Sequence, residues 1–520
     1  MTAWTTCVCT WQHLSSRCHP LLRQHLQQQH CQQCCSSCRT TRSGSTTRSN
    51  STVHEDAVAG GAATSPCRGG GEAAAAGSSQ VCCGVGVAAA APVAWYVPQG
   101  HDDPTLVFES RFECGNLRRA VQVYPYEYDL VLQPDINTRG HTQWYYFSVR
   151  NMRAGQAYIF NIINLQKPDS LYNMGMLPLL HSEQQMLRQG IGWVRAGSNV
   201  YYGPNSIKRG KQQSNFTLTF TMEFPHEHDT VHLAHCYPYS YSDLQNHLYM
   251  LLKEPSSSLV LQRSCLASSL AGNAVDVLTI TAPEGCGTPL SQRQGVVLSA
   301  RVHPGETNAS WMMKGALHQL LGASAEAAAL REQFVFKVVP MLNPDGVVVG
   351  NYRCSLAGLD LNRVWQEPDS RLQPVICAFK GMIRAFMQER QVALFVDMHG
   401  HSRKYGVFCY GCEKKGVRDS RLFPLMLYIN APDLFSFRSC NFKVQKSKAG
   451  TGRVVGFREL GLVNAYTIEA SFCGASVGKY AKQHFNTGHL EDMGAALVRT
   501  LLDYWAPPGL SSAAELAAQL

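Results

Sequence analysis

The chain has 520 residues, of which 45% are hydrophobic and 9% aromatic, enough to bury more than one hydrophobic core. Its formal net charge of +9 favours acidic partners, but the basic residues are too few and too dispersed to indicate a nucleic-acid-binding protein. A membrane-spanning helix is not expected either, because the most apolar stretch, residues 81–97, is diluted by alanine and interrupted by glycine and proline.

Residues 1–100 have an unusual composition. They hold 10 of the 20 cysteines, together with Gln/His/Cys-rich and Ala/Gly-rich runs that follow neither the helix period nor the strand period. We expect this segment to be a disordered low-complexity tail. Its start is rich in Arg, Ser and Thr, with no acidic residue before Glu55, a composition that overlaps organelle transit peptides and leaves a targeting signal as the alternative.

Four cysteines of this tail form two overlapping C-x-x-C pairs: Cys31, Cys34, Cys35 and Cys38. Such pairs could hold a metal ion, but a zinc ribbon needs a second, separated pair, so chance in a low-complexity segment is the other interpretation. The remaining cysteines are scattered through the rest of the chain, as is typical of proteins in a reducing compartment. This distribution indicates the cytoplasm.

Short β-type runs dominate the chain from Leu106 to about Phe224, separated by Asn, Gly and Pro signals. We expect strands at residues 120–124, 143–149, 158–163 and 216–220, without helices between them. This spacing predicts a small antiparallel β-sandwich domain, which we assign to residues 105–230.

Apolar strands alternate with helical segments in residues 231–507, which predicts an α/β domain with a mixed β-sheet flanked by helices. Strands are expected at residues 296–302, 334–341, 392–398 and 465–472, and helices at residues 309–321, 374–389 and 490–505. Ligands of open α/β sheets bind at the carboxyl ends of the strands, so chemistry is sought there. Residues 508–520 are predicted to be a second disordered tail.

Histidines follow two of these strands. His303 and Glu306 form an H-x-x-E spacing on a turn, because the intervening Pro-Gly would break a helix. The third strand ends with His399 and His401, which share one face of an extended segment, so either could reach the same point. A lone histidine is more often an ordinary hydrogen-bonded side chain, but two His and one Glu from separate strand ends indicate a catalytic zinc site.

Further polar residues accompany these two strand ends. Glu469 lies in an otherwise apolar strand, where it is either a general base facing a cleft or a carboxylate paired with arginine. Asn343–Gly346 is predicted to form a turn, and Arg353 and the Asn362-Arg363 pair follow it. These arginines are either surface charges or planar forks that bind a carboxylate, as recognition of a chain end requires.

Together these motifs resemble the zinc carboxypeptidases of the funnelin (metallocarboxypeptidase) class. The segments Gln143–Val149 and Tyr237–Leu244 are similar to the cytosolic carboxypeptidase branch, also called ATP/GTP-binding-protein-like, and the likeness covers about residues 106–505. The resemblance implies a β-sandwich before the catalytic domain and removal of glutamates from tubulin and other acidic tails. It also implies one zinc ion per chain, bound by His303, Glu306 and His399, with His401 beside the site.

The same resemblance implies roles for the other polar residues. Arg353 would polarise the scissile carbonyl and stabilise the oxyanion, Asn362 and Arg363 would hold the terminal carboxylate, and Glu469 would be the general base. Water would attack in one step, without an acyl-enzyme. Where this class usually has Asn-Arg-Asn-Trp, the chain has Val364, which affects the packing of the loop rather than its chemistry. A counterpart of the mobile tyrosine of digestive relatives is not evident.

The resemblance also implies that substrate preference comes from residues 446–453, the segment before the Glu469 strand. A buried cation there needs a carboxylate partner, so we expect Arg453, with Lys448 as second residue, to bind the side chain of a C-terminal glutamate; a solvated loop charge is the alternative. Together with the resemblance, this pocket predicts a cytoplasmic deglutamylase acting on acidic polyglutamylated tails such as those of tubulin, associated with microtubules, cilia or basal bodies. Neither nucleic acid nor membrane is an expected partner.

Two other functions are compatible with these residues. A tubulin-binding scaffold with a decayed catalytic domain is one, although decay usually removes ligands or the base, and all are present. A zinc amidohydrolase acting on small N-acyl amino acids is the other, although the leading sandwich domain argues against it. The sequence does not distinguish branch-point from linear glutamates or set the oligomeric state, and no G-x-x-x-x-G-K-[ST] loop indicates a nucleotide site.

Overall fold

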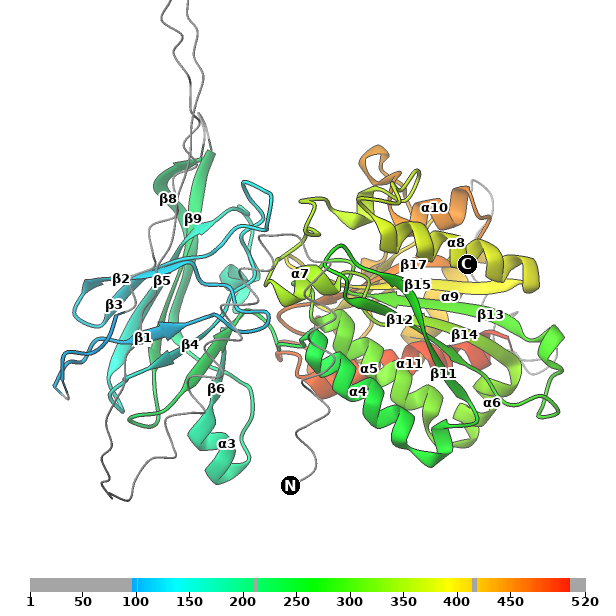
Figure 1. Cartoon of the computed structure of the whole chain (residues 1–520), viewed down its shortest axis with the longest axis horizontal. Coiled ribbons are helices and arrows are strands. Elements are labelled where there is room, and N and C mark those ends of the chain that lie inside the picture. The colour runs from blue at the N-terminus through cyan, green and yellow to red at the C-terminus, as the bar shows by residue number, and fades with distance from the viewer. Residues whose placement is uncertain (1–95, 101, 210–212, 414–418, 506–520) are drawn as a thin grey trace, which may run out of the picture. The chain divides into compact units, whose positions relative to one another are not determined.

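The computed structural model describes residues 96–100, 102–209, 213–413 and 419–505 (Figure 1). Nearly all of the predicted N-terminal tail, including its C-x-x-C pairs, and the whole predicted C-terminal tail lie outside the described residues. Within the described ranges, none of the helices combines the length and the apolar character that crossing a membrane requires.

The first folded part consists of two five-stranded sheets. One has the order β1-β4-β10-β6-β7 with only antiparallel neighbours, and its strands are β1 (Val107–Glu109), β4 (Tyr146–Arg150), β10 (Val231–Ala234), β6 (Leu179–Ser182) and β7 (Val194–Arg195). The other has the order β2-β3-β5-β9-β8, with β2 (Arg119–Tyr124), β3 (Glu127–Val131), β5 (Ala157–Leu165), β9 (Gln213–Glu223) and β8 (Ser198–Arg209).

Aromatic side chains from both sheets form the core of this part. The ring of Phe108 on β1 lies 5.2 Å from that of Tyr128 on β3 and 6.1 Å from that of Phe160 on β5. Buried and less buried residues alternate along β3 and along most of β5, as expected when one face of a strand is covered. The predicted antiparallel sandwich is confirmed, with two differences. The strands β3 and β5 pair in parallel, because the chain passes through β4 of the other sheet between them, and helix α3 (Glu183–Gln189) lies between β6 and β7, where no helix was expected.

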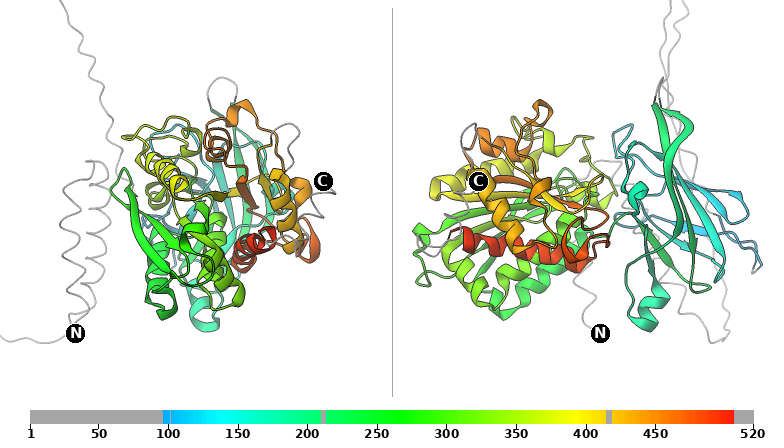
Figure 2. Two further views of the ribbon diagram at one scale, coloured as in Figure 1. Left: turned by 90° about the vertical axis from the view of Figure 1, so that its right-hand side faces the viewer. Right: turned by 180° about the vertical axis from the view of Figure 1, so that it is seen from behind.

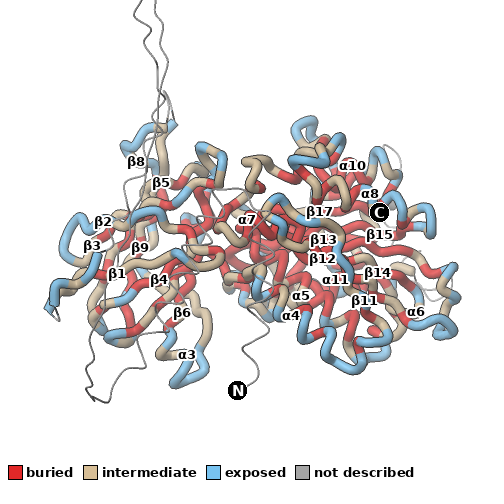
Figure 3. Tube along the Cα trace, in the orientation of Figure 1, coloured by how far each residue is buried: buried red, intermediate tan, exposed pale blue. Residues whose placement is uncertain are grey.

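A seven-stranded mixed sheet forms the centre of the second part, as predicted. Its order is β11-β12-β14-β13-β15-β17-β16, and the neighbours from β14 to β17 are parallel. The strands are β11 (Leu261–Ser268), β12 (Ala274–Ile280), β14 (Phe334–Val339), β13 (Gln294–Ala300), β15 (Val392–His401), β17 (Ala465–Ser471) and β16 (Val407–Tyr410). The central strands β13, β15 and β17 are buried along almost their whole length (Figure 3).

Helices cover both faces of this sheet (Figure 1, Figure 2). The α8 side chains pack with one set of strand residues, and the α5 and α11 side chains pack with the opposite set. The helices are α4 (Tyr241–Lys253), α5 (Asn308–Leu321), α6 (Ala325–Gln333), α7 (Pro344–Val348), α8 (Pro374–Glu389), α9 (Asp419–Asn430), α10 (Gly452–Arg458) and α11 (Thr487–Tyr504). The α5–α11 contact is close enough that a Cβ at Gly494 would lie 1.8 Å from the Met312 carbonyl oxygen.

Several predicted boundaries differ from the structure by up to three residues, and two differences bear on the site. The strand expected to reach residue 302 ends at Ala300, because Arg301 adopts φ 57°, in the left-handed region that ends extended structure. The turn predicted at residues 343–346 is wrong: Pro344 begins the short helix α7, and the Asn343 side chain caps it by accepting a hydrogen bond from the Gly346 N–H. Both differences concern segments that lead into the polar end of the sheet.

Candidate metal and substrate site

The turn that carries His303 and Glu306 is held from beneath by Arg301. This arginine is 2% exposed, and its guanidinium donates hydrogen bonds to the carbonyl oxygens of Pro304 (2.7 and 3.0 Å) and Tyr239 (2.8 Å) and to Ser310 Oγ (2.8 Å). Burial lowers the pKa of Arg301 to about 10, so the group remains charged near neutral pH. A planar five-donor side chain thereby fixes the path of a turn that has no regular backbone pairing of its own.

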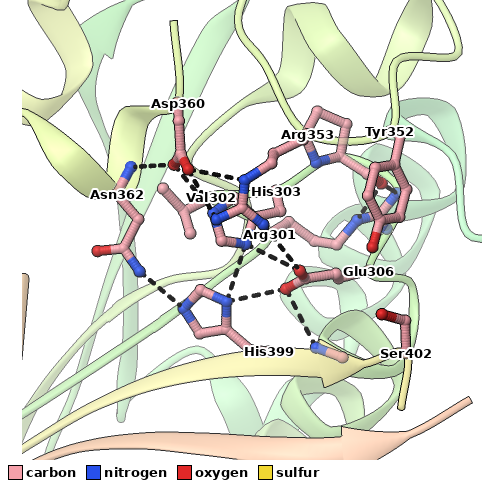
Figure 4. A network of polar contacts seen from close by, with 12 residues as sticks. Arg301, Val302, His303, Glu306, Tyr352, Arg353, Asp360, Asn362, His399 and Ser402 are labelled. Atoms are coloured by element: carbon pink, nitrogen blue, oxygen red, sulfur yellow. Dashed lines mark hydrogen bonds and ion pairs between the residues drawn. The ribbon is translucent and has the colours of Figure 1, made fainter. Parts of the chain in front are cut away.

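Three side chains from this turn and from β15 converge on one point (Figure 4). One ligand atom each from His303, Glu306 and His399 lies within 4.8 Å of the other two, and all three residues are buried. The Nδ1 atoms of His303 and His399 are 3.1 Å apart. Glu306 Oε1 lies 2.9 Å from His303 Nδ1, and Glu306 Oε2 lies 2.8 Å from His399 Nδ1. Such a convergence of two imidazoles and one carboxylate has the donor set of catalytic zinc sites.

Two further carboxylates set the orientation of the imidazoles. Asp360 Oδ1 lies 3.1 Å from His303 Nε2, and Asp397 Oδ2 lies 2.7 Å from His399 Nε2. An ionised carboxylate only accepts hydrogen bonds, so each Nε2 carries the proton and each Nδ1 is left with its lone pair facing the other ligands. The residues present therefore fit a divalent metal ion of the zinc type.

Arg353 lies beside this cluster. Its Nε and Nη2 atoms are both 2.7 Å from Asp360 Oδ2, and its Nη1 atom is 4.0 Å from Glu306 Oε1. Burial raises the pKa of Asp360, but the attraction of His303, Arg353 and Arg363 outweighs it and holds the pKa well below its usual range. Asp360 is therefore an anion that joins an arginine to a metal ligand.

Asn362 and Arg363 lie in the short 3-10 helix η4 (Leu361–Arg363), which follows Asp360. The Asn362 side-chain oxygen accepts a hydrogen bond from the Gly452 N–H at 2.9 Å, which links η4 to α10, and its Nδ2 atom lies 3.4 Å from His399 Nε2. The Arg363 side chain is about one-third exposed, and its Nη1 donates to the Asn362 carbonyl oxygen at 2.6 Å. Val364 is accommodated because it packs against the apolar cluster on the α8 face of the sheet.

Glu469 extends from β17 next to His399. The two residues are direct partners in the parallel pairing of β15 with β17, and Phe408 of β16 is the partner on the other side. No hydrogen bond or ion pair joins this carboxylate to another described side chain, so the alternative of a structural pair with arginine is not observed in that part of the chain. Loss of solvation raises the pKa of Glu469 to about 7, with Glu306 adding to the rise and His399 opposing it.

The two cations predicted to select the substrate occupy different surroundings. Arg453 lies on α10 and is 5% exposed; its Nη1 donates to the Gly411 carbonyl oxygen and to Cys412 Sγ, and its Nε has no partner among the described residues. The guanidinium carbon is 5.9 Å from the centre of the Tyr410 ring. A solvated loop charge is therefore the wrong description of Arg453, because the side chain is buried in a helix without a carboxylate partner within the described ranges.

Lys448 ends the 3-10 helix η6 (Lys446–Lys448) and is half-buried. Partial burial lowers its pKa, and the positive charges of Arg363 and Arg353 lower it further. Lys448 therefore lies in the electrostatic field of the arginines beside the metal cluster. Arg453 is connected to this region less directly, through Tyr410. Burial raises the pKa of the Tyr410 hydroxyl, the charge of Glu469 raises it further, and the charge of Arg453 lowers it.

The structure thus brings His303, Glu306, His399, Arg353 and Asn362 into one network, with Arg363, Glu469 and Lys448 around it. His401 stays outside: its ring lies 5.1 Å from that of Phe408, and its Nδ1 accepts hydrogen bonds from the Arg403 and Lys404 N–H groups. Neither orienting carboxylate was assigned from the sequence. Asp397 could have been found, because it lies two residues before His399 on a buried strand and therefore on the same face.

Comparisons with known proteins agree with this geometry. The zinc carboxypeptidase family matches residues 252–474, and the cytosolic carboxypeptidase N-terminal domain matches residues 108–235. Cytosolic carboxypeptidase 2 of Danio rerio is 52% identical over 409 residues, which cover 78% of this chain and 56% of that protein. Cytosolic carboxypeptidase 2 of Homo sapiens is 50% identical, covering 79% of this chain and 46% of that protein. The chain spans about half the length of the curated relatives it matches.

Solved structures share the same arrangement of the folded parts. Metallo-carboxypeptidases from Burkholderia cenocepacia and Pseudomonas aeruginosa each align with a TM-score of 0.61 at 22% identity, covering 76% of this chain and 98% of those chains. At this level of identity the likeness concerns the fold.

Proposed function

Because the chain belongs to the cytosolic carboxypeptidase branch of the zinc carboxypeptidase family, we propose that it is a metallocarboxypeptidase that removes glutamate from acidic protein tails. The observation that carries the preference for glutamate is the buried Arg453, whose charge no described carboxylate neutralises. A C-terminal glutamate and the last glutamate of a side-chain branch each carry two free carboxylates close together. The proposed activity therefore includes both as substrates.

His303, Glu306 and His399 would hold one Zn²⁺ per chain through Nδ1, a carboxylate oxygen and Nδ1. When bound, zinc supplies Lewis acidity that polarises a carbonyl and makes water a better nucleophile. Asp360 and Asp397 keep the two imidazoles in the tautomer that this requires. All three ligands are buried.

Glu469 is the proposed general base. It is the one carboxylate beside the metal cluster without a hydrogen-bond partner among the described residues, and its raised pKa suits a group that takes a proton and returns it near neutral pH. It would take the proton of the attacking water and deliver it to the departing amine nitrogen. Arg353, next to Glu306, would donate hydrogen bonds to the scissile carbonyl oxygen as negative charge develops there.

Recognition of the chain end falls to the arginine and lysine side chains around the cluster. Arg363 and Asn362 would bind the terminal α-carboxylate, since Arg363 is partly exposed and lies beside Asp360 at the edge of the site. Arg453 and Lys448 would neutralise the γ-carboxylate of the last glutamate. A phenylalanine in this place would leave a buried cation without a partner, and the enzyme would bind it poorly.

The proposed partners are polyglutamylated tails such as those of tubulin, and the net charge of +9 supports attraction of such acidic chains. The cytosolic names of the relatives and the free cysteines of the described residues support a cytoplasmic location. Association with microtubules, cilia or basal bodies follows from the proposed substrate.

To test this proposal, the purified 520-residue chain is assayed for bound metal and for released glutamate. We expect about one zinc per chain by plasma mass spectrometry, consistent with a three-ligand catalytic site. Glutamate should be released from peptides ending in several glutamates and from tubulin tails; matched peptides ending in phenylalanine should react poorly. Removal of zinc by a chelator should abolish release, and added zinc should restore it. Microtubule binding without zinc or turnover would instead favour a scaffold, and faster cleavage of a small N-acyl aspartate would favour an amidohydrolase.

A further inference from the structure

A buried carboxylate of the β-sandwich domain contacts the segment that carries Arg353. Asp135 lies between β3 and β4 and is 1% exposed. Its Oδ1 accepts a hydrogen bond from the Tyr352 N–H at 2.6 Å, and its Oδ2 accepts from the N–H groups of Arg353 and Cys354, both at 2.7 Å. Three successive amides thus bind one anion, an arrangement of charge-assisted hydrogen bonds that is stronger than neutral ones.

Two of these residues, Tyr352 and Arg353, contact the metal ligands or their turn on the other side. The Tyr352 carbonyl oxygen accepts a hydrogen bond from the Gly305 N–H at 2.8 Å, within the turn that carries His303 and Glu306. The approach is so close that a Cβ at Gly305 would lie 2.8 Å from the Tyr352 ring. The backbone of residues 352–354 is therefore enclosed between Asp135 and the ligand turn.

Neighbouring polar contacts extend this attachment. The Ile136 N–H donates to Asn351 Oδ1 at 3.0 Å, Asn137 Nδ2 donates to the Leu356 carbonyl oxygen at 2.7 Å, and Asn116 Nδ2 donates to the Gly350 carbonyl oxygen at 2.9 Å. These contacts join neutral groups. Asp135 is the member that brings a charge into a buried position, where an unmatched anion is costly, so its three donors are the strongest constraint on the segment.

We propose that Asp135 is a positioning residue for the hydrolytic reaction: by fixing the amides of residues 352–354, it holds the Arg353 guanidinium where the oxyanion forms. This inference rests on the proposed function. Arg353 must lie within hydrogen-bond distance of an oxygen that carries charge only in the transition state, and displacements of about 1 Å at such groups cost on the order of 100-fold in rate. The β-sandwich domain thus contributes to turnover through this contact.

A bond that merely joins the domains would have other consequences. Its loss would lower stability and reduce every activity in proportion to the folded fraction, whatever residue stands at position 353. A positioning role acts through Arg353 alone. The two roles are therefore separated by asking whether the effect of removing the Asp135 charge persists once the guanidinium is gone.

The experiment combines Asp135→Asn, Arg353→Ala and the double variant in the full chain. Asp129→Asn is the matched control, since Asp129 lies on β3 of the same domain and accepts its hydrogen bond from Asn161 Nδ2. We expect Asp135→Asn to lower kcat for a glutamate-ended peptide by about 10- to 100-fold, with KM changed less than about twofold and zinc content unchanged. The double variant should be no slower than Arg353→Ala alone.

Amide hydrogen exchange over residues 350–356 provides a readout that is independent of activity. The amides of Tyr352, Arg353 and Cys354 should be protected in the wild-type chain and in Asp129→Asn, and should exchange faster in Asp135→Asn. If Asp135→Asn does not fold, Asp135→Ser, which leaves a small acceptor and room for water, replaces it in both measurements.

The outcomes separate this proposal from the proposed function. Unchanged exchange at residues 352–354, an unchanged kcat, or losses in the double variant that multiply would each overturn the positioning role. A wild-type chain that binds zinc but releases no glutamate would instead overturn the proposed function, and with it the catalytic part of this inference, while the exchange data would still decide whether Asp135 holds the segment.

Discussion

The metal cluster, formed by His303, Glu306 and His399, and the surroundings of Arg453 differ in how far the chain itself neutralises the buried charges. At the metal cluster Glu306 lies between two histidines, Asp397 contacts His399, and Asp360 contacts both Arg353 and His303. Arg453 has neutral acceptors only, the Gly411 carbonyl oxygen and Cys412 Sγ. The chain itself therefore completes the electrostatics of the first region, and an anionic ligand would complete those of the second.

This difference predicts how substitutions divide between the two regions. Changes at the metal cluster should alter turnover or metal affinity for every substrate, because they would disturb the groups proposed to act on the peptide bond itself. Changes at Arg453 should alter the choice of the last residue and leave zinc content unchanged. A variant that behaves in the opposite way would break the comparison.

The largest effect is expected from Glu469→Gln. The substitution keeps the shape of the side chain but removes the proton acceptor, so kcat should fall by about 100- to 10,000-fold while zinc content stays at the wild-type level. Peptide kinetics and metal analysis measure the two quantities. Glu326→Gln, at an exposed position on α6, is the control and should match the wild type. A rate near the wild-type rate in Glu469→Gln would assign the base elsewhere.

Arg453→Met should change selectivity next most strongly. Without the guanidinium, the γ-carboxylate of a terminal glutamate enters a buried site unpaired, which costs about 2 kcal/mol or more, or roughly 30-fold in kcat/KM. The ratio of kcat/KM for glutamate-ended over phenylalanine-ended peptides measures this. Arg458→Met, at an exposed position on the same helix, should leave the ratio unchanged. An unchanged ratio in Arg453→Met would show that Arg453 is a structural cation.

Asp397→Asn tests whether zinc affinity depends on the carboxylate that orients His399. An amide beside His399 Nε2 no longer fixes the tautomer through a charged acceptor, so zinc affinity should fall by about 10- to 100-fold. Competition with a zinc-binding dye gives the affinity. Asp276→Asn removes an equally buried carboxylate that pairs with Arg263 on the sheet edge, and it should lower stability without weakening zinc binding.

Lys448→Ala should have the smallest effect. Lys448 is only half-buried, so the solvent screens its charge and the loss should be about 0.2–1 kcal/mol, or up to roughly fivefold in kcat/KM for glutamate-ended peptides. Raising the salt concentration should reduce this difference further. Lys446→Ala on the same 3-10 helix is the exposed control. An effect of Lys448→Ala equal to that of Arg453→Met would mean that Lys448, and not Arg453, is the main partner of the γ-carboxylate.

Local patterns in the sequence predicted the strands and helices that position the site. β13, β14, β15 and β17 coincide with the four predicted apolar runs to within about three residues, because a strand buried on both faces is continuously apolar. Helix α8 begins and ends at the predicted residues, since Pro374 suits the first turn of a helix and a polar segment follows Glu389. Periodicity and helix-start signals were sufficient for these elements.

The residues that orient the site were harder to find, because their partners are distant in the sequence. Asp135 is 217 residues from Tyr352, and no spacing rule connects a loop of one domain with a loop of another. Asp360 precedes Asn362 in a polar segment and has no feature that marks it as a partner of His303. The burial expected for Arg453 is observed, whereas the helix that carries it was not predicted: α10 begins at Gly452 and packs against Trp365.

Arg301 limits how this ligand turn could be transplanted to another protein. Its backbone conformation, φ 57°, is one that glycine adopts most easily, while its guanidinium is fully engaged beneath the turn. Glycine would relax the backbone and lose the support, and lysine would keep a charge without the planar fork. A designer who grafts His303 and Glu306 onto a new scaffold must therefore bring along Arg301 and the acceptors supplied by Tyr239 and Ser310.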